Sequence, residues 1–163
     1  RDLTQIHIFD HNNPPPVSLE GMPCIHTAPS LRKVGDKWEK ICVGTTTSTR
    51  MDRFTPGLIG QYGVRAIIGK GGLYQGSLDA MQKYGAVYLA IVGGAAALET
   101  EQIEEVEAVY FEELHPEALY RFRVKNFGPL TVAMDSHGVH LYDQVTENVK
   151  KKLPEIYAKL GVL

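Results

Sequence analysis

Two runs of apolar residues in the middle of the chain predict buried β-strands. They cover residues 66–68 and 87–92, and between them apolar side chains recur at helical spacing over residues 77–84, before Gly85. Strand, helix and strand in this order form a βαβ unit, in which the two strands pair in parallel. We therefore expect an α/β domain that binds ligands at the carboxyl ends of these strands.

The remaining segments are shorter and less regular. Residues 12–17 contain three consecutive prolines and should form an extended loop, because proline fits neither a helix interior nor a central strand. Residues 1–10 suit either the end of a helix or an irregular arm. The other expected elements are strands over residues 24–28, 32–34 and 38–43, a helix over 50–61 with Pro56 in its first turn or at a kink, two strands over 119–124 and 130–134 that pair across Gly128-Pro129, and a final helix that Pro154 restarts.

Residues 99–113 form an acidic segment, with seven acidic residues and no basic one. Three apolar residues within it, Ile103, Val106 and Val109, are spaced to face a core. A solvated acidic face is the simplest interpretation, and an acidic patch that binds a partner subunit is the alternative.

The net charge is close to neutral, at −2 over 163 residues. This length suits one domain spanning residues 1–163. The charge balance argues against nucleic acid or a membrane surface as a partner, so any anion recognition must be local. The most apolar run is also too short to span a membrane. The chain starts at Arg1 without a leader, which indicates a processed start or a missing upstream segment.

Two cysteines, Cys24 and Cys42, are the chain's thiols. They lie too far apart for a CxxC metal or redox motif and are too few for a disulfide scaffold. We expect reduced, structural thiols in a cytoplasmic protein, and no metal held by this chain.

Hydroxyl residues and glycines gather in two loops that follow predicted strands. Residues 44–50 hold four threonines and one serine before Arg50, and Lys70 lies twenty positions later in the loop Gly69-Lys70-Gly71-Gly72. Lysine supplies a point charge, arginine a bidentate fork, and glycine lets backbone N–H groups approach an anion. This combination predicts a site for two carboxylates.

The glycine loop has three other interpretations. It lacks the GxxxxGK[ST] spacing of a phosphate-binding P-loop. It does match the GXXG loop of a KH RNA-binding module, although Gln75 stands where that module has an apolar helix anchor. A plain glycine turn is the third possibility, but it leaves Arg50 and the threonines unexplained.

Histidines and one aspartate are further candidates for chemistry. His137 and His140 flank a turn and have no thiol or carboxylate at metal-ligand spacing, so we expect surface histidines. His26 is more simply a satisfied residue at a strand end than a residue that lines the site. Asp52 suits two roles equally, as an acid at a helix start or as the group that orients Arg50.

The two loops resemble those of the β-subunit, or carboxyl-terminal domain, of class I iron-sulfur-dependent fumarate hydratase. The likeness covers GTTTSTRMD at residues 44–52 and IIGKGG at 67–72, and continues through FGP at 127–129 and DSHG at 135–138 to the final helix. The L-tartrate dehydratase β-subunit shares the pattern. The resemblance implies a swivelling β/β/α domain with a central mixed β-sheet flanked by helices.

The resemblance also assigns six residues to the active site. Thr46 matches the threonine proposed as the catalytic base, and Lys70 both grips a substrate carboxylate and assists the base. The implied substrate-binding residues are Arg1, Thr47, Arg50, Lys70 and Gly71. Thr45 departs from the family, which commonly has a proline there, so the loop loses one fixed backbone angle.

The resemblance implies a partner and a cofactor outside this chain. A [4Fe-4S] cluster would be bound by three cysteines of an α-subunit, in a hetero-oligomer of α2β2 type. The implied reaction is reversible hydration of fumarate to L-malate at a shared site, and Met51-Asp52 follows the fumarase version of the motif. L-Tartrate dehydration is the alternative, and KH-like RNA binding through residues 69–72 is the second.

Overall fold

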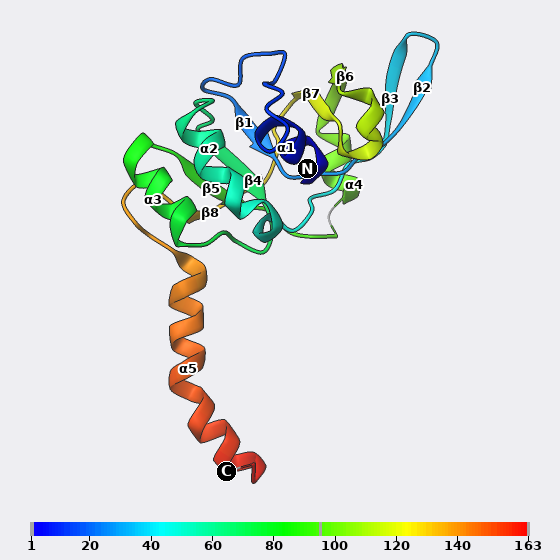
Figure 1. Cartoon of the computed structure of the whole chain (residues 1–163). Helices are drawn as coiled ribbons and strands as arrows, with labels where there is room; N and C mark the ends of the chain where they lie inside the picture. The colour runs from blue at the N-terminus through cyan, green and yellow to red at the C-terminus, as the bar shows by residue number, and fades with distance from the viewer. Residues whose placement is uncertain (1, 95, 163) are drawn as a thin grey trace.

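A four-stranded mixed sheet lies at the centre of the computed structural model, which describes residues 2–94 and 96–162. The strand order is β1-β4-β5-β8 (Figure 1). The strands β1 (Pro23–Ile25), β4 (Ala66–Gly69) and β5 (Val87–Ala90) are parallel, whereas β8 (Thr131–Met134) pairs with β5 in the antiparallel sense. The predicted βαβ unit and the central mixed sheet are both confirmed.

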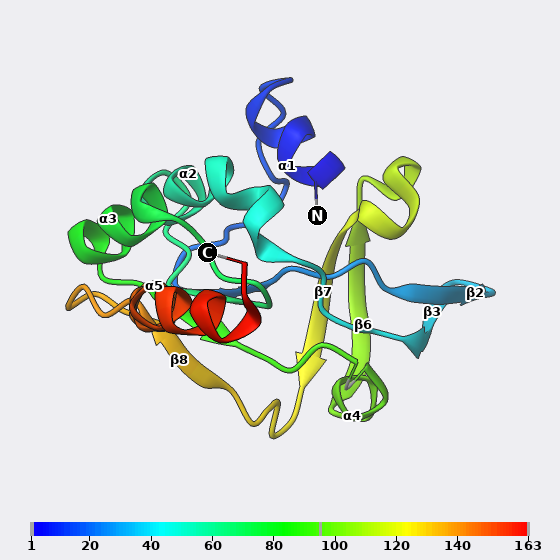
Figure 2. The same cartoon turned by 90° about the horizontal axis from the view of Figure 1, so that it is seen from below.

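Helices α2 (Thr55–Gly60) and α3 (Gln75–Tyr84) lie together beside the sheet (Figure 2). The core that they share with it includes Ile59 of α2, Met81 of α3, Ile67 of β4 and Tyr88 of β5, all with no exposed surface. Gly85 ends α3 in the left-handed conformation, with φ of 74°, as the sequence predicts. The expected helix over residues 50–61 forms as a 3-10 segment, η1 (Ser48–Phe54), followed by α2 with proline in its first turn.

Two antiparallel hairpins accompany the sheet. The first, β2 (Ser30–Val34) with β3 (Lys37–Cys42), projects from the domain, and the second joins β6 (Ile103–Tyr110) to β7 (Leu119–Val124) through η2 (Glu112–Glu117) (Figure 1). Helices α1 (Asp2–Phe9) and α4 (Ala96–Glu101) complete the domain. Of the two alternatives for residues 1–10, a helix or an irregular arm, the structure has the helix, over Asp2–Phe9.

The predicted pairing of residues 119–124 with 130–134 is wrong. β7 pairs with β6, and β8 pairs with β5. Ion pairs accompany the first pairing: Arg121 lies 2.9 Å from Glu107, and Arg123 forms an ion pair with Glu105 directly opposite it. Much of the acidic segment is thus a solvated strand face, as predicted, but with arginine partners on the neighbouring strand.

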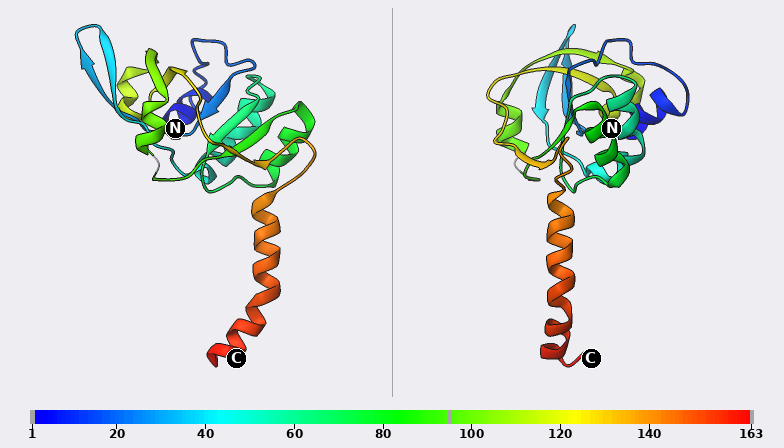
Figure 3. Two further views of the ribbon diagram at one scale, coloured as in Figure 1. Left: turned by 180° about the vertical axis from the view of Figure 1, so that it is seen from behind. Right: turned by 90° about the vertical axis from the view of Figure 1, so that its left-hand side faces the viewer.

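The C-terminal helix α5 (Leu141–Leu160) extends away from the domain and buries none of its residues (Figure 3). The predicted restart at Pro154 is wrong, since the helix continues through it. Proline removes one backbone N–H from the helix, and the carbonyl left without a donor is accessible to water on an exposed helix. No helix in the described residues has the length and apolar character needed to cross a membrane.

Candidate functional site

The hydroxyl-rich loop and the glycine loop are joined through their backbones. Thr47 forms a parallel β-bridge with Lys70, and the Ser48 N–H donates to the Lys70 carbonyl at 2.8 Å. The Thr49 hydroxyl then donates to the Gly71 carbonyl at 3.0 Å. Both loops lie at the carboxyl ends of parallel strands, where such sheets bind ligands. The structure therefore brings together the two segments that the sequence singles out.

Thr46 is oriented by the residue at the end of β1. Its backbone N–H donates to the His26 carbonyl at 2.7 Å, and its hydroxyl donates to the same carbonyl at 3.2 Å. The His26 N–H in turn donates to the Ile68 carbonyl at 2.8 Å, which fixes this edge to β4. Because the hydroxyl proton is directed at His26, the lone pairs of the Thr46 oxygen are left to accept a hydrogen bond from a ligand.

Lys70 lies half-buried against the backbone of Gly93. A Cβ atom added to Gly93 would stand 2.9 Å from the lysine Cδ and 3.1 Å from its Nζ, so a side chain at that position would displace the ammonium. Within the described part of the chain, Lys70 makes no ion pair. Its charge is therefore available to a carboxylate ligand.

Arg50 is held by α1. Its Nε lies 3.8 Å from the Asp2 Oδ2, and its side chain is about half exposed, at 48%. Since an ion pair this exposed is weak, Arg50 can exchange Asp2 for a ligand carboxylate at little cost. Arg1 precedes Asp2 but lies outside the described residues, so its predicted binding role stays a prediction.

Asp52 lies within η1 and not in its first turn, and it serves instead as the acid at the start of a neighbouring helix, α3, with no ion pair to Arg50 among the described residues. Its Oδ1 accepts from the Tyr74 N–H and from the Ser77 hydroxyl, each at 2.7 Å, at the beginning of α3. The neighbouring Met51 is fully buried. Both residues of the Met51-Asp52 pair therefore serve packing and helix capping.

A buried hydrogen-bond network lies directly beneath the two loops. The Ser48 Oγ is 3.0 Å from the His26 Nδ1 and accepts from the Tyr88 hydroxyl at 3.1 Å, while Gln5 lies 3.4 Å from the His26 Nε2. Burial lowers the pKa of His26 to about 3 and raises the pKa of Tyr88 to about 12, so both are neutral at physiological pH. His26 is thus a satisfied core residue, as expected, and only its carbonyl faces Thr46.

The buried neutral His26 predicts a loss of stability in mild acid. The unfolded chain, with an ordinary histidine pKa of 6.5, takes up a proton that the folded protein excludes until the pH approaches 3. Stability from this residue is therefore complete above pH 6.5 and falls below it, by about 2 kcal/mol at pH 5. Urea unfolding at pH 7.5 and 5 should show this loss, and His26→Gln should show less of it. Equal losses in both proteins would contradict the assignment.

His140 is not the surface histidine that the sequence predicts. It is 7% exposed and caps α5, accepting from the Asp143 N–H at its Nδ1 and contacting the Leu73 carbonyl through its Nε2 at 3.0 Å. The sequence shows only the turn, whereas the contact with Leu73 depends on how α5 meets the glycine loop.

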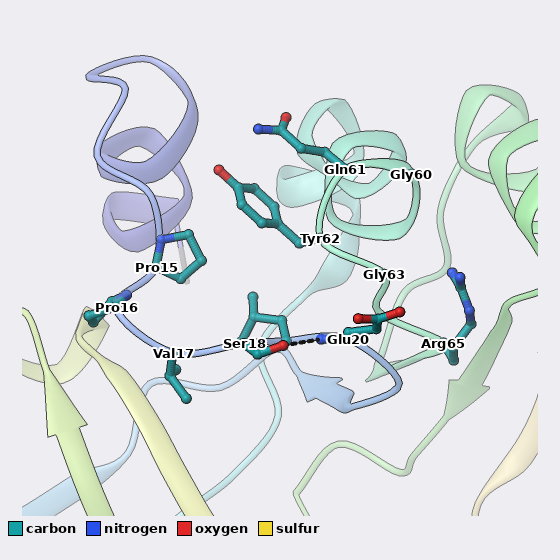
Figure 4. A pocket seen from close by; sticks show the side chains of 11 residues that line it. Pro15, Pro16, Val17, Ser18, Glu20, Gly60, Gln61, Tyr62, Gly63 and Arg65 are labelled. Atoms are coloured by element: carbon teal, nitrogen blue, oxygen red, sulfur yellow. Dashed lines mark hydrogen bonds between the residues drawn. The ribbon is translucent and has the colours of Figure 1, made fainter.

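The cavities of the domain lie elsewhere. An open hollow of about 600 Å³ is lined by residues 15–20 and 60–65, which precede β1 and β4 (Figure 4). A more enclosed, apolar cavity of about 370 Å³ lies between Ile68 of the sheet and Phe122 of β7. Neither is lined by a predicted site residue. The candidate site lies on the loops at the opposite ends of the strands, away from both of these cavities.

The described residues do not fit an iron-sulfur cluster. Across residues 2–94 and 96–162, no three His, Cys, Asp or Glu side chains are placed to hold a metal ion. Burial raises the pKa of the Cys24 thiol, and Cys42 is exposed at the end of β3. Such clusters are ligated by several cysteine thiolates. This chain does not supply that set.

The structure is a mixed α/β domain whose two joined loops carry a threonine, a lysine and an arginine. Residues 1–145 match the family described as Fumarase C-terminus, and the chain belongs to that family. It is 41% identical over 151 residues to the L(+)-tartrate dehydratase subunit beta of Escherichia coli strain K12, covering 92% of this chain and 74% of that protein.

Two further relatives show the same breadth across this chain. The putative L(+)-tartrate dehydratase subunit beta of Methanocaldococcus jannaschii is 41% identical over 94% of this chain and 80% of its own length. The putative fumarate hydratase class I of Geobacillus stearothermophilus is 37% identical over 95% of this chain but only 30% of its own length. The predicted family is confirmed, and the relatives are hydro-lyases by name. The match includes the glycine loop, and so favours a hydro-lyase over RNA binding.

Proposed function

We propose that this chain is the β-subunit of an iron-sulfur-dependent hydro-lyase that acts on four-carbon dicarboxylates. One observation supports the proposal: the bridge between Thr47 and Lys70 joins the loop that carries Thr46 to the loop that carries the lysine, and Arg50 follows in the 3-10 segment η1. Two cations next to a hydroxyl acceptor match a substrate with two carboxylates and one proton to lose.

The residues of this chain bind and orient the substrate. Lys70 takes one carboxylate as a point charge, and Arg50 takes the other through its planar fork. The substrate C–H then faces the lone pairs of Thr46, whose own proton is held by the His26 carbonyl. A threonine hydroxyl can take up this proton only as the alkoxide, after its own proton has passed to solvent or to another base at the shared site, and the positive charge of Lys70 would favour the alkoxide. Thr47 and Gly71 are exposed beside them and complete the proposed binding surface.

Hydration of fumarate to L-malate is the first candidate reaction. Its original support from Met51-Asp52 is weakened, because both residues are structural. Dehydration of L-tartrate is the second candidate, favoured by the 41% identity to proteins named as tartrate dehydratase β-subunits. L-Malate and L-tartrate differ by one hydroxyl group, and residues outside this chain would contact that group.

The proposed partner is an α-subunit that carries the [4Fe-4S] cluster, in an α2β2 assembly. The exposure of Thr47 and Arg50 on the loops supports a site that is shared with the partner. The partner would cover the loops, exclude water and supply the group that handles the departing hydroxyl.

The isolated chain is expected to be inactive and colourless, and to gain activity when it is co-expressed anaerobically with its α-subunit. Fumarate formed from L-malate is followed by its ultraviolet absorbance, and oxaloacetate formed from L-tartrate by coupled reduction. The faster substrate identifies the reaction. Turnover by the isolated chain, or no turnover of either substrate by the reconstituted pair, would contradict the proposal.

A further inference from the structure

One of the seven acids in the segment over residues 99–113 is buried. Glu99, in α4, is 2% exposed, whereas the other six are at the surface or partly so. Neither of its carboxylate oxygens has a hydrogen-bond partner among the described residues. Burying a carboxylate in this way is costly, so a buried acid without partners is a mark of function more than of stability.

Glu99 lies behind the hydroxyl-rich loop. The next residue, Thr100, accepts a hydrogen bond at 2.8 Å from the N–H of Val43, immediately before Gly44. Burial raises the pKa of Glu99, while the Thr45 backbone N–H, which lies near the carboxylate without completing a hydrogen bond, and the Lys70 charge oppose the rise. The Thr45 hydroxyl is also buried without a partner. The carboxylate therefore lies close to the Thr45 backbone and within electrostatic reach of Lys70, without forming an ion pair with it among the described residues.

We propose that Glu99 is a positioning residue for Lys70: its buried carboxylate attracts the ammonium from behind and fixes where Lys70 meets the substrate. The inference rests on the proposed hydro-lyase function and adds a residue to it. Gly93 leaves the space through which the lysine passes, and α4, anchored at Val43, holds the opposing charge.

The arrangement has a chemical logic. Away from solvent, attraction between opposite charges is stronger and longer in range than in water. Lys70 is thereby restrained while one face of its ammonium stays open to the substrate carboxylate. Without Glu99 the lysine keeps its charge but loses its orientation. Binding should then suffer less than the chemical step, which depends on the placement of the reacting groups.

The test compares Glu99→Gln with Glu101→Gln in the reconstituted αβ enzyme. Glu101 lies on the same helix and is exposed, so its variant should behave as wild type. Glu99→Gln keeps the size but removes the charge, and should lower kcat by about 10- to 100-fold with a smaller change in KM. Its Tm should not fall, because the replaced carboxylate has no hydrogen bond to lose.

A double variant separates positioning from a general structural effect. In a Lys70→Ala background, Glu99→Gln should cause no further loss of kcat/KM, since the residue it positions is absent. Three results would overturn this inference without touching the proposed function. They are a wild-type kcat in Glu99→Gln, an equal loss of kcat/KM from Glu99→Gln in the wild-type and Lys70→Ala proteins, and a fall in the Tm of Glu99→Gln that accompanies its loss of kcat. If the wild-type pair turns over neither L-malate nor L-tartrate, the proposed function fails first and the inference falls with it.

Discussion

Replacing Lys70 with alanine should reduce kcat/KM of the reconstituted enzyme by roughly 30- to several-thousand-fold, the expected consequence of removing a charge-assisted contact of about 2 to 5 kcal/mol. The lysine makes no ion pair within the described part of the chain, so its removal leaves no buried carboxylate newly deprived of a hydrogen bond. The loop itself is fixed by backbone groups, through the Thr47 bridge and the Ser48 N–H. Steady-state kinetics with L-malate and L-tartrate measure the loss, and thermal unfolding should show an intact fold.

A matched control comes from the β2–β3 hairpin. Lys37 is exposed at the start of β3, remote from both loops, and Lys37→Ala should retain wild-type kinetics. Arg50→Ala should resemble Lys70→Ala, because it removes the other proposed carboxylate contact. Wild-type turnover by Lys70→Ala would remove this residue from the site, whatever the behaviour of the other variants.

Gly69→Ala should destabilise the domain by about 2 to 4 kcal/mol, or lower the Tm by roughly 5 to 15 °C. An added Cβ would collide with the Ser48 Oγ and stand 3.3 Å from the Ser48 Cβ. Ser48 has no room to yield, since it is fully buried and hydrogen-bonded to His26 and Tyr88. The methyl group must therefore break that network or push the two loops apart. Differential scanning calorimetry measures the change.

Gly76→Ala is the control for this substitution. Gly76 lies in α3 with nothing within 4 Å of an added Cβ, and alanine there should be neutral or stabilise the helix by about 0.5 to 1 kcal/mol. Adding Ser48→Gly to Gly69→Ala removes the colliding atom and should recover part of the lost stability. A Tm for Gly69→Ala equal to that of wild type would show that Ser48 is not confined as described.

The periodicity of the chain predicts the centre of the fold but not its edges. Residues 66–68, 77–84 and 87–92 have unambiguous patterns, and the structure places strands and a helix there. The partner of β7 was mispredicted because strand pairing is not local. The arginines of β7 and the glutamates of β6 come together only once the strands pair, and neither strand reveals its partner alone.

The site was predictable to the extent that it follows from sheet topology. The loops around Thr46 and Lys70 were expected to meet as the carboxyl ends of parallel strands, and they do meet, but the first loop follows β3 of the separate antiparallel hairpin and reaches β1 and β4 through bridges of its own. Sequence reasoning missed the supporting groups, namely Asp2 beside Arg50, Ser48 below the loops, and Glu99. Glu99 carries no local signal, because its neighbours are equally acidic and only the packing of α4 buries it.

The two loops are joined through main-chain N–H and C=O groups, which every residue except proline provides in full. The groups that fix the shape of the two loops are therefore different from the side chains proposed to bind and react with the substrate. The side chains at positions 46, 47 and 70 can be exchanged without removing the bonds that hold the loops together, whereas Ser48 and Gly69 cannot. For protein engineering, the same scaffold can therefore be given a different set of reactive groups at three adjacent positions, with the domain's stability left to the residues beneath them.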